Sequence, residues 1–338
     1  MNPFLCVVDL EGGPVGIDAL TAALPAIGQA DERAEVQLNG SWGAAWVPST
    51  ALARPAIAHR SGVLALGSVR ITNRASFPAP AGGIPRPEDD LDLVLEHYLR
   101  RGVGGFRDLT GDFAFALWDT RLQQLVAVRD AVGVRSLFFQ QRGSRLAVAS
   151  HLDCFEPAGY DREFIADFLI GIPKGTTRTI FSDVTRLAPG SYLIAAGNRL
   201  SVTRYWSADE FEAQDAVADE REAVYRFKGL FREAVAAQLE DGQPTWAQLS
   251  GGLDSSSVVA MAQTLAADGA VAPLRGTETV VDRLSDGDET KYSDAVVRQY
   301  GLRNEQIVDY WAWQGDDVGP PSFADPRPFL PFFARDRA

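Results

Sequence analysis

The sequence predicts two domains of different fold class, an α+β domain with antiparallel sheets followed by an α/β domain with a parallel sheet. Up to about Tyr205 the chain is rich in short segments that alternate apolar and polar residues, as half-buried strands do. A polar, acidic stretch at 207–220 is typical of a linker. Beyond it strands and helices alternate, which favours a parallel sheet. We therefore expect domains at 1–206 and 221–338.

Composition supports a folded protein and excludes several function classes. The chain has 338 residues, 46% hydrophobic and 23% charged, enough for the cores of two ordinary domains. No apolar run approaches the length that a bilayer requires, and no basic segment of a signal peptide precedes the first apolar run. A net charge of −13 disfavours nucleic-acid binding. We expect a cytoplasmic protein that binds neither membrane nor nucleic acid.

The first half contains recognisable elements in order. Strands are expected at 40–47 and 63–71, and an exposed loop rich in Pro, Ala and Gly at 75–87. An amphipathic helix is expected at 90–101, beginning at Asp89 or Asp90. Its apolar face comprises Leu91, Val94, Leu95 and Tyr98.

The cysteines and histidines do not suggest a metal site. Cys6 and Cys154 are too few for a disulfide framework and wrongly spaced for zinc. Cys6 lies in the apolar run 4–8, so we expect a buried thiol in a strand. His59, His97 and His151 are scattered along the chain.

Three apolar segments, 109–119, 125–130 and 133–139, have the alternation of successive buried strands. They include Gly-Asp-Phe-Ala-Phe-Ala and an Arg-Asp-x-x-Gly turn before a Leu-aromatic pair. This order resembles the glutaminase-like domain of the asparagine synthetase family, and the similarity continues through 187–193 and 204–206. The resemblance implies an Ntn-hydrolase-like fold with stacked antiparallel sheets.

The residues that the family uses for glutamine hydrolysis are not matched. There the nucleophile is a cysteine at the mature N-terminus. In this sequence Asn2 follows Met1, and the amine of Cys6 is a peptide nitrogen. The position of the family's Asn-Gly segment reads Arg70-Ile71-Thr72-Asn73-Arg74. We expect an inactive glutaminase, as in the β-lactam synthetases and the macrolactam synthetases of lasso peptides.

The second half centres on a strand, a glycine loop and a helix. After an amphipathic helix at 221–240 comes a strand at 245–249, the loop 250–257 and a helix that Gly269 ends. The four small polar residues after the glycines can each cap a helix start. The apolar stripes are Val224, Phe227, Phe231, Ala234, Val235 and Leu239 on the first helix, and Val258, Met261, Ala262 and Leu265 on the second.

The loop is a candidate anion site, because adjacent glycines leave the amides of a helix N-terminus accessible. It lacks the Lys of a Walker loop and the G-x-G-x-x-G spacing. The string Ser-Gly-Gly-x-Asp-Ser-Ser resembles the PP-loop of the ATP pyrophosphatases, which implies ATP and adenylation of an acyl group. An ordinary capped turn is the alternative. The resemblance assigns ATP to Leu249, Ser250, Gly251, Gly252, Asp254, Ser255 and Ser256, and Mg²⁺ to Asp254.

The remaining elements complete a β-α-β-α-β order. Strands are expected at 277–281 and 306–308, separated by an acidic loop at 282–289 and a helix at 289–300. The segments 279–284, with Tyr292 after it, and 325–328 resemble the lasso-cyclase branch. The alternatives are a solvated acidic loop and a proline-broken tail.

Three functions follow from this resemblance. The first is a glutamine-independent, ATP-dependent amide ligase of the lasso macrolactam type, with a peptide or amino-acid carboxylate as substrate and a precursor peptide and protease as pathway partners. The second is an asparagine synthetase relative that uses free ammonia. The family has a second acidic loop that completes the magnesium site, and this sequence does not contain that loop. The chain could therefore be a fragment or one half of a split enzyme, and the third function is that of a non-catalytic nucleotide-binding scaffold. No residue is assigned as general base.

Overall fold

The computed structural model describes residues 3–21, 34–47, 57–78, 89–171, 175–197, 199–211, 219–239, 244–281 and 289–308. The chain divides between Glu212 and Ala213 into two compact units. Most of the expected loops at 75–87 and 282–289, and all of the segment 325–328, lie outside the described residues.

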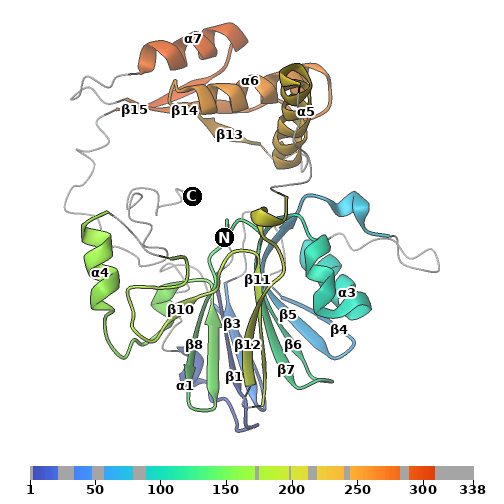
Figure 1. The fold of residues 1–338 in the computed structure, drawn as a ribbon, viewed down its shortest axis with the longest axis vertical. Coiled ribbons are helices and arrows are strands. Elements are labelled where there is room, and N and C mark those ends of the chain that lie inside the picture. Colours follow the sequence, from blue (N-terminus) through green and yellow to red (C-terminus); the bar gives the residue numbers. More distant parts are fainter. Residues whose placement is uncertain are drawn as a thin grey trace. The chain divides into compact units, whose positions relative to one another are not determined.

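The first unit contains two six-stranded antiparallel sheets (Figure 1). One has the order β10-β8-β9-β1-β3-β2 and the other β12-β11-β7-β6-β5-β4. The first comprises β1 (Phe4–Asp9), β2 (Glu35–Asn39), β3 (Trp42–Trp46), β8 (Phe138–Arg142), β9 (Arg145–Ala149) and β10 (Thr185–Arg186). The second comprises β4 (Ile57–Arg60), β5 (Val63–Ile71), β6 (Gly111–Asp119), β7 (Gln124–Arg129), β11 (Ser191–Ala196) and β12 (Arg199–Arg204). The antiparallel sheets expected from the alternating segments are therefore present.

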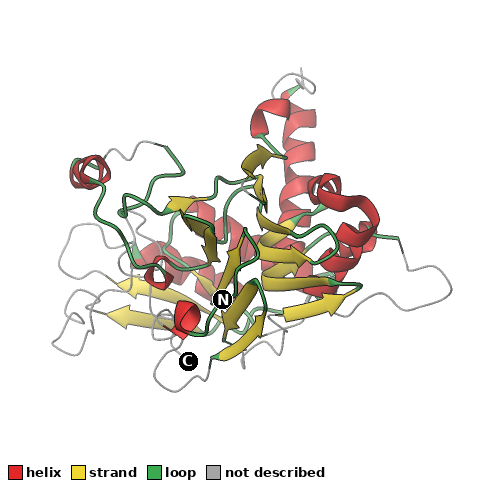
Figure 2. Cartoon of the chain, turned by 90° about the horizontal axis from the view of Figure 1, so that it is seen from below, coloured by secondary structure: helices red, strands yellow, loops and turns green. Residues whose placement is uncertain are grey.

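The two sheets stack on each other, and the alternation of side chains explains how. One core joins Phe4, Cys6 and Val8 of β1 to Leu64 and Leu66 of β5 and to their neighbours in both sheets. Successive residues of a strand point to opposite faces, so the residues between them face outward. Figure 2 shows the strands in yellow and the helices in red, with the chain seen from below. The expected stacking of antiparallel sheets is confirmed.

Helix α3 (Asp90–Arg101) covers the outer face of the second sheet, beside β4 and β5 in Figure 1. The carboxylate of Asp89 accepts hydrogen bonds from the amides of Leu91 and Asp92 at 2.7 and 3.4 Å, so Asp89 is the N-cap. Gly102 ends the helix with φ +61°. The expected bounds and the expected buried face are both confirmed. The other described α-helices of this unit are α1 (Asp18–Thr21) and α4 (Arg162–Leu169).

The Arg-Asp-x-x-Gly turn between β7 and β8 is held by buried charges. The Asp130 carboxylate, fully buried, accepts from the amides of Gly133, Val134 and Arg135 at 2.6 to 2.9 Å. The Arg129 guanidinium donates to the carbonyls of Gly133, Arg135 and Leu187. Because buried charges are costly without hydrogen bonds, both residue types are needed at these positions. These hydrogen bonds fix the conformation of the turn within the first unit.

The second unit contains a parallel sheet in the order β13-β14-β15. Its elements are α5 (Glu220–Leu239), β13 (Trp246–Gln248), α6 (Leu253–Ala267), β14 (Gly276–Val281), α7 (Thr290–Tyr300) and β15 (Asn304–Val308). Each crossover between neighbouring strands passes through one helix, as parallel pairing requires. The expected β-α-β-α-β order is confirmed. Gly269 follows α6 with φ +72°, as expected of a helix stop.

The expected apolar faces of α5 and α6 were wrong in part. Val235 and Leu239 of α5 are buried, but Val224 and Phe227 are 47% and 65% exposed. In α6 the buried residues are Val259, Ala262 and Leu265, whereas Val258 is 42% exposed. The stretch 258–262 of α6 is apolar on nearly every side, so helical periodicity does not define one buried face there.

Candidate functional site

The glycine loop leaves the sheet at the carboxyl end of β13 and is anchored to β14. Leu249 is buried, its amide donates to the carbonyl of Glu278 at 2.8 Å, and its carbonyl accepts from Thr279 Oγ1 at 2.9 Å. Thr279 is itself buried. The sequence analysis did not assign a role to this threonine, and no local signal distinguishes it from Thr277 in the same strand. The anchor fixes where the loop begins.

Hydrogen bonds between two serines close the loop. Ser250 N donates to Ser255 Oγ at 3.2 Å, and the two hydroxyl oxygens lie 3.1 Å apart. The amide of Gly252 donates to Ser250 Oγ at 3.3 Å, and Ser255 Oγ donates to the carbonyl of Gly252 at 3.3 Å. Gly251 adopts φ +91°, a conformation that favours glycine. The loop is therefore shaped before any ligand enters.

The start of α6 differs from the capped helix that the polar residues suggested. Gly252 is the N-cap, and no side chain caps the helix, since Asp254, Ser255 and Ser256 lie inside its first turn. The first helical hydrogen bond runs from the amide of Ser256 to the carbonyl of Gly252 at 3.1 Å. Within the described part of the chain, the amides of Leu253, Asp254 and Ser255 donate to no protein acceptor. Three donors and the positive end of the helix dipole are thus available to an anion.

The structure brings all the sequence-predicted site residues into this one turn. Leu249 supports the loop from the core, while Ser250, Gly251, Gly252, Asp254, Ser255 and Ser256 lie at its partly exposed or exposed surface. Asp254 is exposed, and its carboxylate has no hydrogen-bond or ion-pair partner among the described residues. A carboxylate in this position fits Mg²⁺ held mainly by phosphate oxygens and water. No group of three potential metal ligands occurs in the described ranges.

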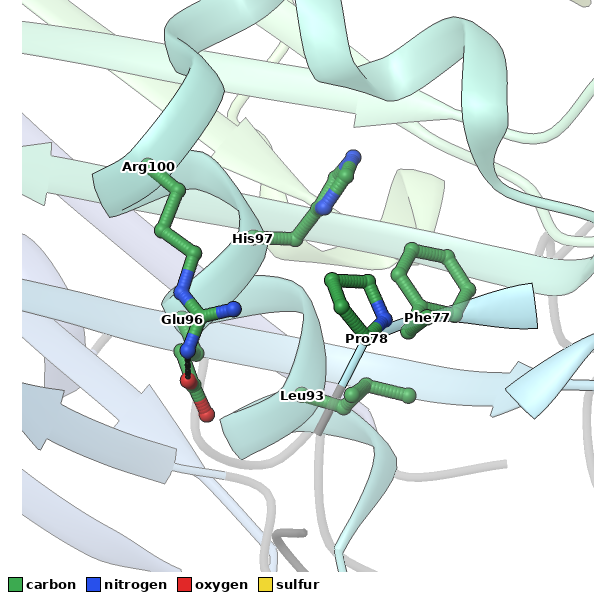
Figure 3. Close-up of a pocket in the computed structure, with 6 residues that line it drawn as sticks. All are labelled: Phe77, Pro78, Leu93, Glu96, His97 and Arg100. Carbon is green, nitrogen blue, oxygen red and sulfur yellow. Dashed lines mark hydrogen bonds and ion pairs between the residues drawn. The ribbon is translucent and has the colours of Figure 1, made fainter. Parts of the chain in front are cut away.

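A shallow pocket lies elsewhere, in the first unit, between α3 and the chain that follows the 3-10 turn at Arg74–Ser76 (Figure 3). It is lined by Phe77, Pro78, Leu93, Glu96, His97 and Arg100. Glu96 pairs with Arg100 and, at 3.4 Å, with Arg60. The Nε2 of His97 lies 3.0 Å from both the Gly105 carbonyl and the Asp108 carboxylate. Because these polar groups are already paired, the pocket is best explained as packing around α3.

Neither cysteine is a candidate nucleophile. Cys6 lies in β1 between Ala44 of β3 and Val148 of β9, and burial raises the pKa of its thiol to about 12. Burial likewise raises the pKa of Cys154 to about 12, with a smaller contribution from the charge of Asp153. The expected buried strand thiol at Cys6 is confirmed.

Comparison with known proteins identifies both units. Residues 82–206 match the family model of the glutamine amidotransferase domain, and residues 226–309 match that of asparagine synthase. The chain therefore carries an amidotransferase-type domain followed by an asparagine synthase-type domain. The resemblance to the asparagine synthetase family that the motifs indicated is confirmed for both domains.

Two curated relatives agree with this assignment in sequence. The amidase chyE of Penicillium rubens is 34% identical over 184 residues, which cover 53% of this chain and 27% of that protein. Asparagine synthetase [glutamine-hydrolyzing] 3 of Bacillus subtilis is 32% identical over 181 residues, which cover 51% of this chain and 29% of that protein. The chain thus spans less than a third of the length of these relatives. A glutamine phosphoribosylpyrophosphate amidotransferase from B. subtilis aligns with 90% of this chain and 65% of its own at 12% identity, with a TM-score of 0.42.

No helix among the described residues combines the length and the apolar character needed to cross a bilayer.

Proposed function

We propose that this chain carries the nucleotide site of an ATP-dependent ligase that forms amide bonds through an acyl-adenylate. The observation that supports this most is the open amide cluster at Leu253, Asp254 and Ser255, next to a glycine loop in a segment that matches the asparagine synthase model. Three amides at a helix start that donate to no acceptor among the described residues favour a phosphate. The loop's position at the carboxyl ends of parallel strands is where such sheets bind ligands.

The proposed chemistry is a transfer of the adenylyl group. A substrate carboxylate attacks the α-phosphorus of ATP, the bond to the β-phosphate oxygen breaks, and pyrophosphate leaves; an amine then displaces AMP. The protein must stabilise negative charge on the leaving group, which fixed donors do without reorganising. The free amides and the hydroxyls of Ser250, Ser255 and Ser256 are such donors. Mg²⁺, when bound, would neutralise phosphate charge, and Asp254 is the residue that would hold it.

We also propose that the first unit has an Ntn-hydrolase-like fold but does not hydrolyse glutamine. The stacked antiparallel sheets support the fold. A nucleophilic cysteine needs an accessible thiol of low pKa, and both cysteines of this chain are buried with raised pKa values. Asn73 lies at the position of the family's glutamine-binding segment. Its side-chain oxygen accepts a hydrogen bond from the amide of Thr110, and its side-chain nitrogen donates to the carbonyl of Asp108. The unit then serves as a scaffold.

Within the family we propose the branch of lasso peptide macrolactam synthetases, with a peptide carboxylate as substrate. The supporting features are the motif at 279–284 and the buried thiols, since an enzyme without glutaminase activity must take its amine from another source. A precursor peptide and a protease would be its pathway partners. The test is turnover: AMP and pyrophosphate should form with a precursor peptide, whereas formation that depends on aspartate and ammonia would assign the chain to asparagine synthesis instead.

Two substitutions test the nucleotide site. Ser250→Ala should weaken Mg·ATP binding by about tenfold or more, because hydrogen bonds to charged groups contribute about 1.5–3 kcal/mol. Asp254→Ala should weaken it by about tenfold or more as well, because it removes the carboxylate that would hold Mg²⁺. Isothermal titration calorimetry measures the affinities. Asp268→Ala, at the other end of α6, is the matched control and should bind as the unaltered chain does. Unchanged affinity in both loop variants would remove the basis for a nucleotide site.

A further inference from the structure

The first turn of α7 packs directly against the glycine loop. A Cβ on Gly251 would lie 2.6 Å from the carbonyl oxygen of Glu289, and 3.1 Å from both the amide nitrogen of Ser293 and the Cβ of Tyr292. Ser293 is fully buried at this contact, and its hydroxyl donates to the carbonyl of Thr290 at 3.0 Å. The backbone of the first turn of α7 and the Cβ of Tyr292 therefore lie beside the loop.

The loop itself provides neutral donors and no cation. Its groups are backbone amides, the hydroxyls of Ser250, Ser255 and Ser256, and the negative carboxylate of Asp254. The triphosphate of ATP carries several negative charges, and charge grows on the pyrophosphate as it leaves. Hydrogen bonds to a charged partner are about twice as strong as neutral ones. A positively charged side chain next to the loop would therefore strengthen the binding of the triphosphate beyond what the neutral donors of the loop achieve.

Lys291 is such a side chain. It is exposed, and its Nζ lies 4.7 Å from the centroid of the Tyr292 ring. Tyr292 is also the residue whose Cβ approaches Gly251, so Lys291 adjoins a residue that packs against the loop, and its ammonium group rests on the Tyr292 ring while remaining exposed. A lysine side chain is long and flexible, so its ammonium group can reach the terminal phosphates of a bound triphosphate.

Two other cations of this unit have partners of their own, and a third lies at the far end of α7. Arg232 pairs with Asp268 at the carboxyl end of α6, 2.8 Å apart. The guanidinium of Arg303 lies 5.1 Å from a ring centroid of Trp246, and Arg303 also pairs with Glu305. Arg298 lies in the last turn of α7, about 10 Å along the helix axis from Lys291.

We propose that Lys291 binds the β- and γ-phosphates of ATP and neutralises the departing pyrophosphate, with Tyr292 positioning its ammonium group. The inference rests on the proposed function and adds a residue outside the glycine loop to the binding site. It predicts that Lys291 contributes to the affinity for ATP and pyrophosphate but not to that for AMP, because AMP lacks the two phosphates that Lys291 would contact.

Calorimetric titrations of the full chain with Mg·ATP, Mg-pyrophosphate and AMP test this inference. Lys291→Gln should lower the affinity for Mg·ATP and pyrophosphate by about tenfold and leave that for AMP unchanged. Lys291→Arg, which keeps the charge, should retain most of the affinity. Arg298→Gln removes the same charge from the far end of the same helix and should change the affinities by less than about twofold, because exposed charges at that distance are screened.

The outcomes separate this inference from the proposed function. If the unaltered chain binds Mg·ATP but Lys291→Gln behaves like Arg298→Gln, Lys291 does not contact the phosphates and the nucleotide site stands. If the unaltered chain binds no Mg·ATP, both proposals are wrong. A loss of AMP affinity equal to that of ATP would also contradict the inference. Tyr292→Ala, compared with Tyr292→Phe, tests the positioning role, since only the first removes the ring.

Discussion

Cys6 illustrates how a single position limits what the first unit can do. Its neighbours across the ladder are Ala44 and Val148, and its thiol faces the core between the two sheets. Moving a thiolate from water into such a core is costly, so the thiol stays protonated. The same holds for Cys154, which is also buried. A protonated, inaccessible thiol is a poor nucleophile.

This leads to a prediction about thiol chemistry. With pKa values of about 12, both thiols are neutral at every pH from 7 to 10 and become thiolates only above that range. Ellman's reagent should therefore titrate no cysteine in the folded protein at pH 8 and two after denaturation. Rapid reaction of one thiol in the folded state would show that a cysteine is accessible, and would reopen the question of a covalent step in the first unit.

At the scale of elements, the glycine loop and the first turn of α7 form one packed assembly. Gly251 is needed for two separate reasons, its φ of +91° and the absence of space for a Cβ against Glu289. Gly269, after α6, has φ +72° but no atom within 4 Å of the position that a Cβ would take. A comparison of substitutions at Gly251 and Gly269 therefore separates the energetic cost of the backbone conformation from the cost of a steric clash.

We predict that Gly251→Ala lowers the free energy of unfolding of the second unit by about 3 kcal/mol and weakens Mg·ATP binding, because it adds a steric clash to a backbone cost of about 1–2 kcal/mol. Gly269→Ala should show only the backbone cost and normal binding. Chemical denaturation followed by tryptophan fluorescence, combined with calorimetric titration, measures both effects. Equal losses in the two variants would indicate that the contact with α7 contributes nothing.

An element was predicted correctly from the sequence where a local signal allowed only one interpretation, and incorrectly where it allowed several. The start of α3 was predicted because Asp89 is a capping residue. The buried face of α6 was not, because Val258, Val259 and Met261 make the helix apolar on several sides. The site residues were found from a motif, but the uncapped amides, the anchor from Thr279 and the contact of α7 with Gly251 depend on tertiary packing that no local pattern encodes.

At the scale of the whole molecule, the two units have separate cores of very different size. The first unit has three buried clusters that involve both sheets, α1 and α3. The buried cluster of the second unit comprises seven described residues: Val235, Leu239, Leu249, Val259, Ala262, Leu265 and Leu274. Val224, Phe227 and Leu230 of α5 are exposed. Because stability derives largely from apolar burial, the second unit should be the less stable of the two.

This difference predicts two transitions in differential scanning calorimetry, with the second unit unfolding at the lower temperature. Mg·ATP binds only the folded second unit in our proposal, so saturating ligand should raise the lower transition and leave the upper one unchanged. At a hundred times Kd the added stability is about 2.7 kcal/mol. At the same ligand concentration, a tenfold weaker affinity in Asp254→Ala should reduce the added stability to about 1.4 kcal/mol. Neither transition should move in the absence of ligand, since Asp254 is exposed and unpaired among the described residues. A single transition that rises as a whole with Mg·ATP would contradict the prediction and show that the two units unfold as one cooperative block.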